Sequence, residues 1–144
     1  MHSLTQNIEI HLVNDAVANA SNTDDNSARI DMADYESATF IVPVVDSAAT
    51  GVAALTVEAS DADTDCAMAA INGATATLTC AVNDDINGKL LIVEVRNPPR
   101  RFIQAVITSA VANIAFGATT VLLTPRRLPV VDHSTVGAIA YVSE

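Results

Sequence analysis

Residues 100–108 read RRFIQAVIT, and this stretch decides the fold class. Successive side chains on a β-strand project to opposite faces. Ile103, Ala105 and Ile107 would therefore face one side of a sheet, and the residues between them would face the other. This alternation predicts a strand with one buried face, opened by a pair of arginines.

Short apolar runs of this kind recur along the chain, separated by turn-forming residues. The clearest runs lie at residues 37–45, 52–59, 74–82, 89–96 and 114–124. Short strands spaced at about ten residues by turn signals are typical of antiparallel sandwiches and barrels. We therefore expect an all-β protein built as an antiparallel β-sandwich.

The length of 144 residues fits one domain. A chain of this size buries roughly two-thirds of its unfolded surface, so its core needs no metal or disulfide. We expect an extended N-terminal arm over residues 1–12, the sandwich over residues 13–127 and a C-terminal tail over residues 128–144. The tail is apolar and has no clear partner strand, which suggests that it packs on something else, such as a neighbouring copy.

The formal net charge of −10 is unevenly distributed along the chain. Residues 1–88 hold fourteen acidic residues and one arginine, a balance of −13, whereas residues 89–144 hold six basic and three acidic residues, a balance of +3. The pattern fits either an acidic, soluble surface or attraction between copies of the chain. Nucleic acid is not an expected partner, because phosphate binding needs a net basic face and stacking aromatic residues.

The sequence indicates synthesis in the cytoplasm without a membrane partner. No uncharged apolar stretch of about 18 residues is present, and the first residues lack the pattern of a signal peptide. Cys66 and Cys80 have no CxxC spacing. Two interpretations of them stay open: ordinary thiols in a reducing compartment, or a bridge formed after the protein leaves the cell.

The residues that usually carry catalysis are poorly placed for it. His2, His11 and His133 all fall in the expected arm and tail, away from any nucleophile in the sandwich. No pair of histidines or cysteines has metal-ligand spacing, and no glycine-rich loop cradles phosphate. We expect no enzyme, no catalytic residues, no cofactor and no metal site.

An acidic loop at residues 60–65, SDADTD, deserves comparison with a calcium-binding loop. Asp61, Asp63 and Asp65 alternate as the first three ligands of an EF-hand do. The required Gly at the sixth position and Glu at the twelfth are missing, and the flanking residues favour strands over helices. An acidic surface loop is the preferred interpretation.

Two Pro-Arg-Arg steps are the sharpest remaining feature. One opens the strand at residues 100–108 and the other follows the strand at residues 114–124. If these strands pair antiparallel, both steps reach the same edge of the sandwich. Arginine forms bidentate contacts with carboxylates and is enriched in interfaces. We expect the four arginines either to form a subunit or capsid interface or to pair within the chain with Asp84, Asp85 or Glu94; they are Arg100, Arg101, Arg126 and Arg127.

Two segments resemble small virion proteins of tailed bacteriophages, most closely the head-decoration, or capsid cement, proteins. They are IDMADYESATFIVPVV at residues 30–45 and NPPRRFIQAVITSAVANIAFGATTVLLTPRRLPV at residues 97–130. The shared pattern is Ile or Val, Asp, two residues, Gly or Asp, then Tyr-Glu-Ser before an apolar strand. An Arg-Phe/Tyr-Ile/Val-x-Ala-x-Ile-Thr strand follows later, and an apolar strand closes on Pro-Arg.

The resemblance implies a jelly-roll-like sandwich that is often a homotrimer and is encoded beside the major capsid protein. Such a protein binds the capsid exterior over junctions between capsomers and stabilises the lattice against internal DNA pressure. The major capsid protein and other copies of the chain would be its partners. Competing interpretations are a neck, head-tail adaptor or tail component of the virion, or a module that binds the host surface.

Overall fold

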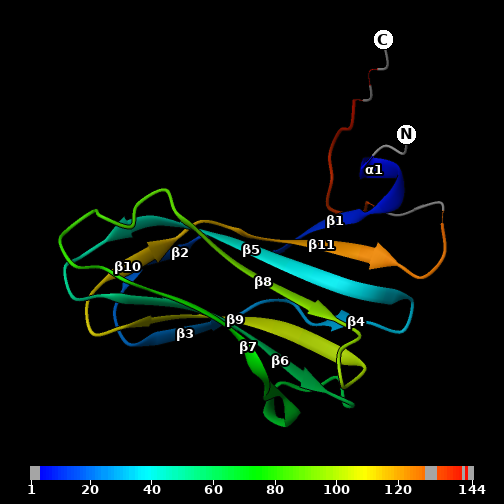
Figure 1. Cartoon of the computed structure of the whole chain (residues 1–144), viewed down its shortest axis with the longest axis horizontal. Coiled ribbons are helices and arrows are strands. Elements are labelled where there is room, and N and C mark those ends of the chain that lie inside the picture. The colour runs from blue at the N-terminus through cyan, green and yellow to red at the C-terminus, as the bar shows by residue number, and fades with distance from the viewer. Residues whose placement is uncertain (1–3, 129–132, 141, 143–144) are drawn as a thin grey trace.

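The computed structural model describes residues 4–128, 133–140 and 142. Two antiparallel sheets pack face to face, which confirms the predicted β-sandwich (Figure 1). The elements in chain order are α1 (Leu4–Asn7), β1 (Glu9–Asn14), β2 (Val17–Ala20), β3 (Thr23–Asn26), β4 (Ile30–Asp31), β5 (Tyr35–Ser47), β6 (Val52–Ser60), the 3₁₀ turn η1 (Asp65–Ala67), β7 (Ala69–Thr79), β8 (Leu90–Arg96), β9 (Phe102–Ala110), β10 (Ile114–Phe116) and β11 (Thr119–Pro125).

The first sheet is organised by β5, whose 13 residues contact three other strands. The strand order is β1-β11-β5-β10-β2, and β8 pairs with the other side of β5. The break between β10 and β11 lies opposite Pro43. β11 pairs with β5 as far as Ile41, and β10 pairs with β5 from Val44 onward. Proline has no N–H to donate, so the ladder is interrupted there. The single strand predicted over residues 114–124 is therefore two strands.

Gly117 occupies this break for a steric reason. Its N–H donates to the Pro43 carbonyl at 2.9 Å. A Cβ atom at this position would lie 2.5 Å from Cγ of Pro43, which is closer than van der Waals contact permits. Glycine is used where a backbone must approach another group this closely.

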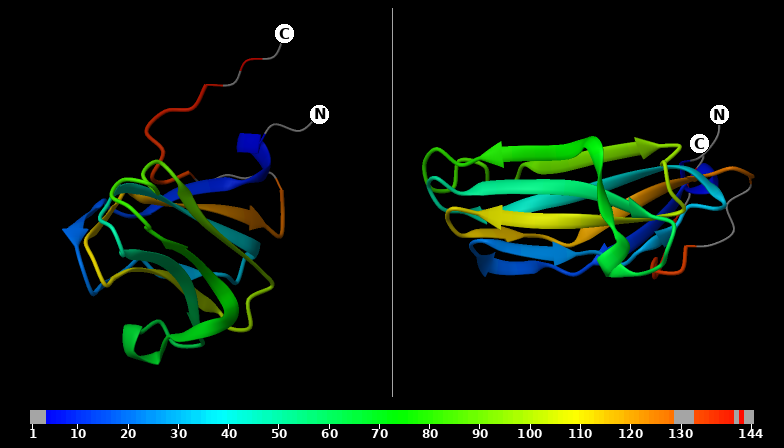
Figure 2. Two further views of the ribbon diagram at one scale, coloured as in Figure 1. Left: turned by 60° about the vertical axis from the view of Figure 1, so that its left-hand side comes forward. Right: turned by 90° about the horizontal axis from the view of Figure 1, so that it is seen from below.

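The second sheet has the order β3-β9-β6-β7, with β4 pairing with β9 beyond β3. β9 pairs with β6 along its whole length, from Val52 opposite Ala110 to Ser60 opposite Phe102. The stretch that begins at Arg100 thus supplies the centre of this sheet. Figure 2 shows from two further directions how the two sheets form the layers of the sandwich.

The core consists of small apolar side chains on the inner faces of both sheets. Alternate residues of β5 are fully buried, with Phe40 and Val42 at 0% exposure. They face buried residues of β6 and β9, including Leu55 and Ile107. Burying a side chain of this size contributes about 1.5–3 kcal/mol. The alternation read from the sequence of these strands identifies the core correctly.

The N-terminal region differs from the prediction. Residues 9–12, expected in an extended arm, belong to β1 and pair with β11. Residues 19–27, NASNTDDNS, have the composition of an exposed turn-rich loop, yet they contain β3, which pairs with β9. β1 carries the buried Glu9 among its apolar residues, and β3 is wholly polar, with Asp24 accepting a hydrogen bond from the Thr108 hydroxyl at 2.7 Å. Side-chain hydrogen bonds replace the apolar contacts that usually mark a strand.

The dipeptide Asn72-Gly73 is a strong turn signal in the sequence, but the structure does not place a hairpin turn there. Both residues lie inside β7, where the pairing register shifts between Thr56 and Glu58 of β6. The shift leaves residues 71–74 of β7 opposite Val57 of β6, a larger irregularity than a simple β-bulge, and Gly73 within it has the positive φ of 83° that glycine accepts readily. The same residue types favour tight turns and bulges, so sequence alone did not separate the two.

The described part of the C-terminal tail leaves the sandwich beside β1 and leads away from both sheets (Figures 1 and 2). Residues 133–140 form no strand or helix. Some of the predicted features lie outside the described residues: positions 1–3 of the arm with His2, and positions 129–132, 141 and 143–144 of the tail.

Candidate functional site

The two Pro-Arg-Arg steps reach the same end of the sandwich, but by a different route from the one predicted. β9 lies in the second sheet and β11 in the first, so they do not pair with each other. The chain crosses between the sheets after β9, with a turn at Val111, and β11 returns in the opposite direction. The start of β9 and the end of β11 therefore lie at the same end of the molecule.

Three of the four predicted interface arginines line one groove of about 430 Å³. We call it the arginine groove, and its lining residues are Met32, Ala33, Asp61, Pro98, Pro99, Arg100, Arg101 and Arg126. The fourth, Arg127, follows directly and is exposed. The groove is assembled from the turn between β4 and β5, the end of β6 and the two Pro-Arg-Arg steps.

The first arginine pair is neutralised within the chain. Arg101 binds Asp31 with two hydrogen bonds, from Nε at 3.0 Å and from Nη2 at 2.7 Å. Its guanidinium also lies 5.1 Å from the centre of the Phe102 ring. Arg100 binds Asp61 at 2.5 Å. The expected intrachain partners Asp84, Asp85 and Glu94 are thus wrong for this pair.

These contacts have electrostatic consequences. The hydrogen bond from Arg101 lowers the pKa of Asp31, and that from Arg100 lowers the pKa of Asp61. In return, the hydrogen bond to Asp31 raises the pKa of Arg101. A hydrogen bond to the charged form of a group favours that form. Both carboxylates are therefore ionised near neutral pH and poor proton acceptors.

Among the described residues, the second arginine pair has a backbone contact in place of an ion pair. The N–H of Arg126 donates to the Asp34 carbonyl at 2.8 Å. The side chains of Arg126 and Arg127 are exposed and form no ion pair with any residue that the structure describes. Two guanidinium groups are thus available to a partner at the arginine groove.

The acidic loop at residues 60–65 is divided among separate partners. Asp61 binds Arg100, while Asp63 binds Arg29 at 2.5 Å. Asp65 accepts hydrogen bonds from Asn26 at 2.8 Å and Gln104 at 3.0 Å. Within the described residues no group of three or more His, Cys, Asp or Glu side chains is arranged to hold a metal ion. The loop ties β3, β6 and β9 together.

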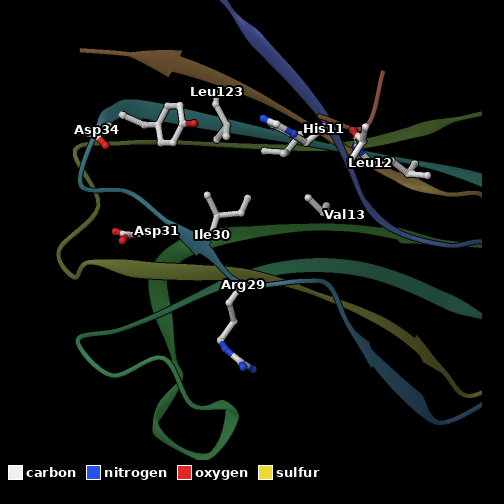
Figure 3. A pocket seen from close by; sticks show the side chains of 11 residues that line it. His11, Leu12, Val13, Arg29, Ile30, Asp31, Asp34 and Leu123 are labelled. Atoms are coloured by element: carbon white, nitrogen blue, oxygen red, sulfur yellow. Dashed lines mark hydrogen bonds between the residues drawn. The ribbon is translucent and has the colours of Figure 1, made fainter. Parts of the chain in front are cut away.

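A second groove lies on the other side of the turn at residues 31–35. We call it the β1–β4 groove; its volume is about 420 Å³, and it is lined by His11, Leu12, Val13, Arg29, Ile30, Asp31, Asp34, Tyr35, Val121, Leu123 and Thr135. Ile30 points toward Val13 and Leu123 across the opening, while the Arg29 side chain points away from it (Figure 3). Its interior is apolar and its rim is charged.

A chain of polar contacts crosses the rim of this groove. The Tyr35 hydroxyl donates to Oε2 of the buried Glu9, and Nε2 of His11 lies 3.1 Å from the same oxygen. Nδ1 of His11 lies 3.3 Å from Oγ of Ser134. Sequence reasoning placed His11 and Ser134 in separate terminal segments and missed their contact. The alternation of Glu9 and His11 on one strand face was the available signal.

The C-terminal segment is attached to α1 and β1 by three consecutive residues. His133 contacts the Thr5 carbonyl at 3.0 Å, Ser134 contacts His11, and Thr135 accepts the N–H of Leu12 at 2.8 Å. We call residues 133–135 the tail anchor. It fixes where the tail leaves the sandwich.

The remaining predicted features have simple outcomes. Cys66 is exposed and Cys80 is buried, and both are free thiols. The Cys80 thiol donates to the Val82 carbonyl at 2.9 Å. Among the described residues, no helix has the length and apolar character needed to span a bilayer.

Comparison with known proteins identifies the fold and no family. No protein-family description matches the chain, and no curated protein sequence matches it. The PBSX exported protein XepA has a similar structure, with a TM-score of 0.55 and 16% identity over 99% of this chain. The chain spans about half of that protein, 46% of its length.

Two further solved structures share less of the arrangement. A pilus protein from Bacillus endospore appendages has a TM-score of 0.44 and 18% identity over 83% of this chain and 90% of its own. A CBM4 protein has a TM-score of 0.43 and 8% identity over 72% of this chain and 61% of its own. At these identities the similarity concerns the β fold alone.

Proposed function

We propose that this chain is a structural protein of a tailed-bacteriophage virion that binds the capsid exterior and stabilises the lattice. One observation carries the proposal: the two segments that resemble head-decoration proteins form adjoining strands. Residues 30–45 hold β4 and most of β5, and residues 97–130 hold β9, β10 and β11. β4 pairs with β9, and β5 pairs with β10 and β11.

The two segments also build the arginine groove together. The Asp31–Arg101 ion pair joins one segment to the other, as does the hydrogen bond from Arg126 to Asp34. A resemblance scattered over unrelated surfaces would indicate only shared strand composition. The Asp31–Arg101 ion pair and the Arg126–Asp34 hydrogen bond join the segments at one end of the molecule, which supports that end as the surface for partners. The fold is also one used by the PBSX exported protein XepA.

In this proposal Arg126 and Arg127 bind acidic side chains of the major capsid protein. The arginine fork suits carboxylates, and a groove lined by prolines and by immobilised arginines holds its shape before binding. A protein that binds only the assembled lattice stabilises it according to its concentration and affinity. A homotrimer would make three such contacts at once, which raises the avidity.

We propose a binding role and no catalysis for this site. General bases need a pKa near the working pH. The carboxylates at the arginine groove have lowered pKa values because they are bound to Arg100 and Arg101. Such groups are suited to holding the surface in shape.

The experiment that tests the function begins with the mass of the purified protein in solution by light scattering. The protein is then mixed with empty capsids assembled from the major capsid protein of the same genome, and the retained copies are counted. A trimer retained at hundreds of copies per capsid is the expected result. A monomer that ignores capsids contradicts the proposal, and a ring retained at one vertex indicates a head-tail adaptor instead.

A further inference from the structure

The β1–β4 groove has the properties of a site for an apolar segment. Its volume of about 420 Å³ falls within the range of roughly 300–1,000 Å³ that ligand sites occupy. Ile30, Val13 and Leu123 point into it (Figure 3). Among the described residues, only Thr135 of the C-terminal segment reaches it, at its rim.

The chain carries a segment suited to this groove directly after the tail anchor. Residues 136–140 read VGAIA and contain no charge. Ile139 is 49% exposed, and Val142 beyond it is 79% exposed. Uncharged residues can enter an apolar groove without the cost of desolvating a charge. Gly137, Ala138 and Ala140 are small enough to leave Ile139 as the one large side chain to be seated.

The tail anchor directs this segment away from the groove of its own chain. The N–H of Val136 donates to the His133 carbonyl at 2.8 Å, which turns the backbone just beyond the anchor. In Figures 1 and 2 the segment then leads away from the sandwich. Within the described residues of one copy, residues 136–140 therefore do not line the groove, although Thr135 directly before them does.

We propose that residues 136–140 of one copy occupy the β1–β4 groove of a second copy. The segment and the groove are different surfaces of the chain, so a head-to-tail contact between copies is possible; such a contact is heterologous and closes into a ring when the rotation permits. A ring of three copies gives the homotrimer of the proposed function, so the inference deepens that part of it. Its test takes place in solution and needs no capsid.

Cysteine cross-linking tests the contact between copies. In a Cys66→Ser background, one variant carries Leu12→Cys at the groove and another carries Ile139→Cys in the segment. Their wild-type residues are 48% and 49% exposed. We expect that mixing and oxidising the two variants gives a disulfide-linked heterodimer on a non-reducing gel. A disulfide forms when the two Cα atoms lie within about 7 Å.

The matched control replaces Leu12→Cys with Leu90→Cys. Leu90 is 53% exposed and lies in β8, which is at the opposite edge of the same sheet from β1. Equal cross-linking to both positions would reflect random collision and would overturn the proposal. So would the absence of a heterodimer. A chain carrying both Leu12→Cys and Ile139→Cys that links only to itself would show that the segment fills its own groove, which also overturns it.

Truncation after Thr135 provides a second measurement, because it keeps the tail anchor and removes the segment. We expect an unchanged circular dichroism spectrum and a lower mass by light scattering. An unchanged mass would contradict the proposal. If the cross-link forms but capsids retain no protein, the contact between copies stands and the capsid function fails. If capsids retain the protein but no cross-link forms, the capsid function stands and the contact between copies fails.

Discussion

The two Pro-Arg-Arg steps have the same sequence but differ in how their arginine side chains are paired. In the first, Arg100 and Arg101 are bound by Asp61 and Asp31. In the second, the side chains of Arg126 and Arg127 find no ionic partner among the described residues. A motif therefore does not decide whether an arginine serves the fold or a partner. The carboxylates that neighbouring strands place beside it decide this.

The strand register explains the difference. Phe102 lies opposite Asp31 of β4 on one side and opposite Ser60 of β6 on the other. Asp61 directly follows Ser60, so a carboxylate adjoins the first step on each side. Pro125 at the second step lies opposite Tyr35. Asp34 beside it provides its backbone carbonyl to Arg126. One step is consequently closed by ion pairs and the other is open.

Reversing the charge of the open step gives the largest expected effect. We predict that Arg126→Glu with Arg127→Glu lowers capsid affinity by at least about tenfold, because repulsion replaces attraction to acidic partner groups. The measurement is the number of copies retained per capsid at a fixed concentration. Lys89→Glu, a charge reversal in the turn before β8, is the control and should change retention little. Equal losses would mean that net charge alone governs binding.

Opening the closed step should act in the other direction. Asp31→Asn with Asp61→Asn releases Arg100 and Arg101, which already line the same groove. We predict a rise in capsid affinity of about threefold and a steeper loss of binding with added salt, because exposed charges are screened. A salt titration of retention measures both. Weaker binding by this variant would show that the ion pairs shape the groove for its partner.

The two steps should also differ in their effect on folding. Arg101→Ala removes an ion pair and the contact with Phe102, and we predict a melting temperature lower by about 1–3 °C, since exposed ion pairs contribute modestly. Arg127→Ala removes no such contact and should lower it by less than about 1 °C. Calorimetry of both variants makes the comparison. Equal destabilisation would argue against the difference between the steps.

Acid should weaken the closed step selectively, with the smallest effect. Arg100 and Arg101 lower the pKa of Asp61 and Asp31 below the usual 3.8, so the unfolded chain takes up protons first as pH falls. The stability that these pairs contribute is present above pH 3.8 and is lost as pH falls through the native pKa values. Urea unfolding from pH 5 to 2 should therefore show a shallower decline for Asp31→Asn with Asp61→Asn. A parallel decline would contradict this linkage.

The strands with a strong apolar alternation could be predicted closely from the sequence. Residues 37–45, 52–59 and 89–96 correspond to β5, β6 and β8 within about two residues at each end. β1 and β3 did not show a clear apolar alternation, because Glu9 is buried within β1 and β3 consists of four polar, mostly exposed residues; Glu9 and Asp24 accept hydrogen bonds from Tyr35 and Thr108. Their partners are 26 and 84 residues away in the chain.

The antiparallel sandwich, its apolar core and the positions of the two arginine steps follow from the sequence, because alternation and composition are local properties. Tertiary structure alone decided that β9 and β11 lie in different sheets and yet meet at one end. It also decided which arginines are paired, and it attached residues 133–135 to α1 and β1. These outcomes depend on strand register and on the crossing between sheets, which join residues that no sequence window contains together.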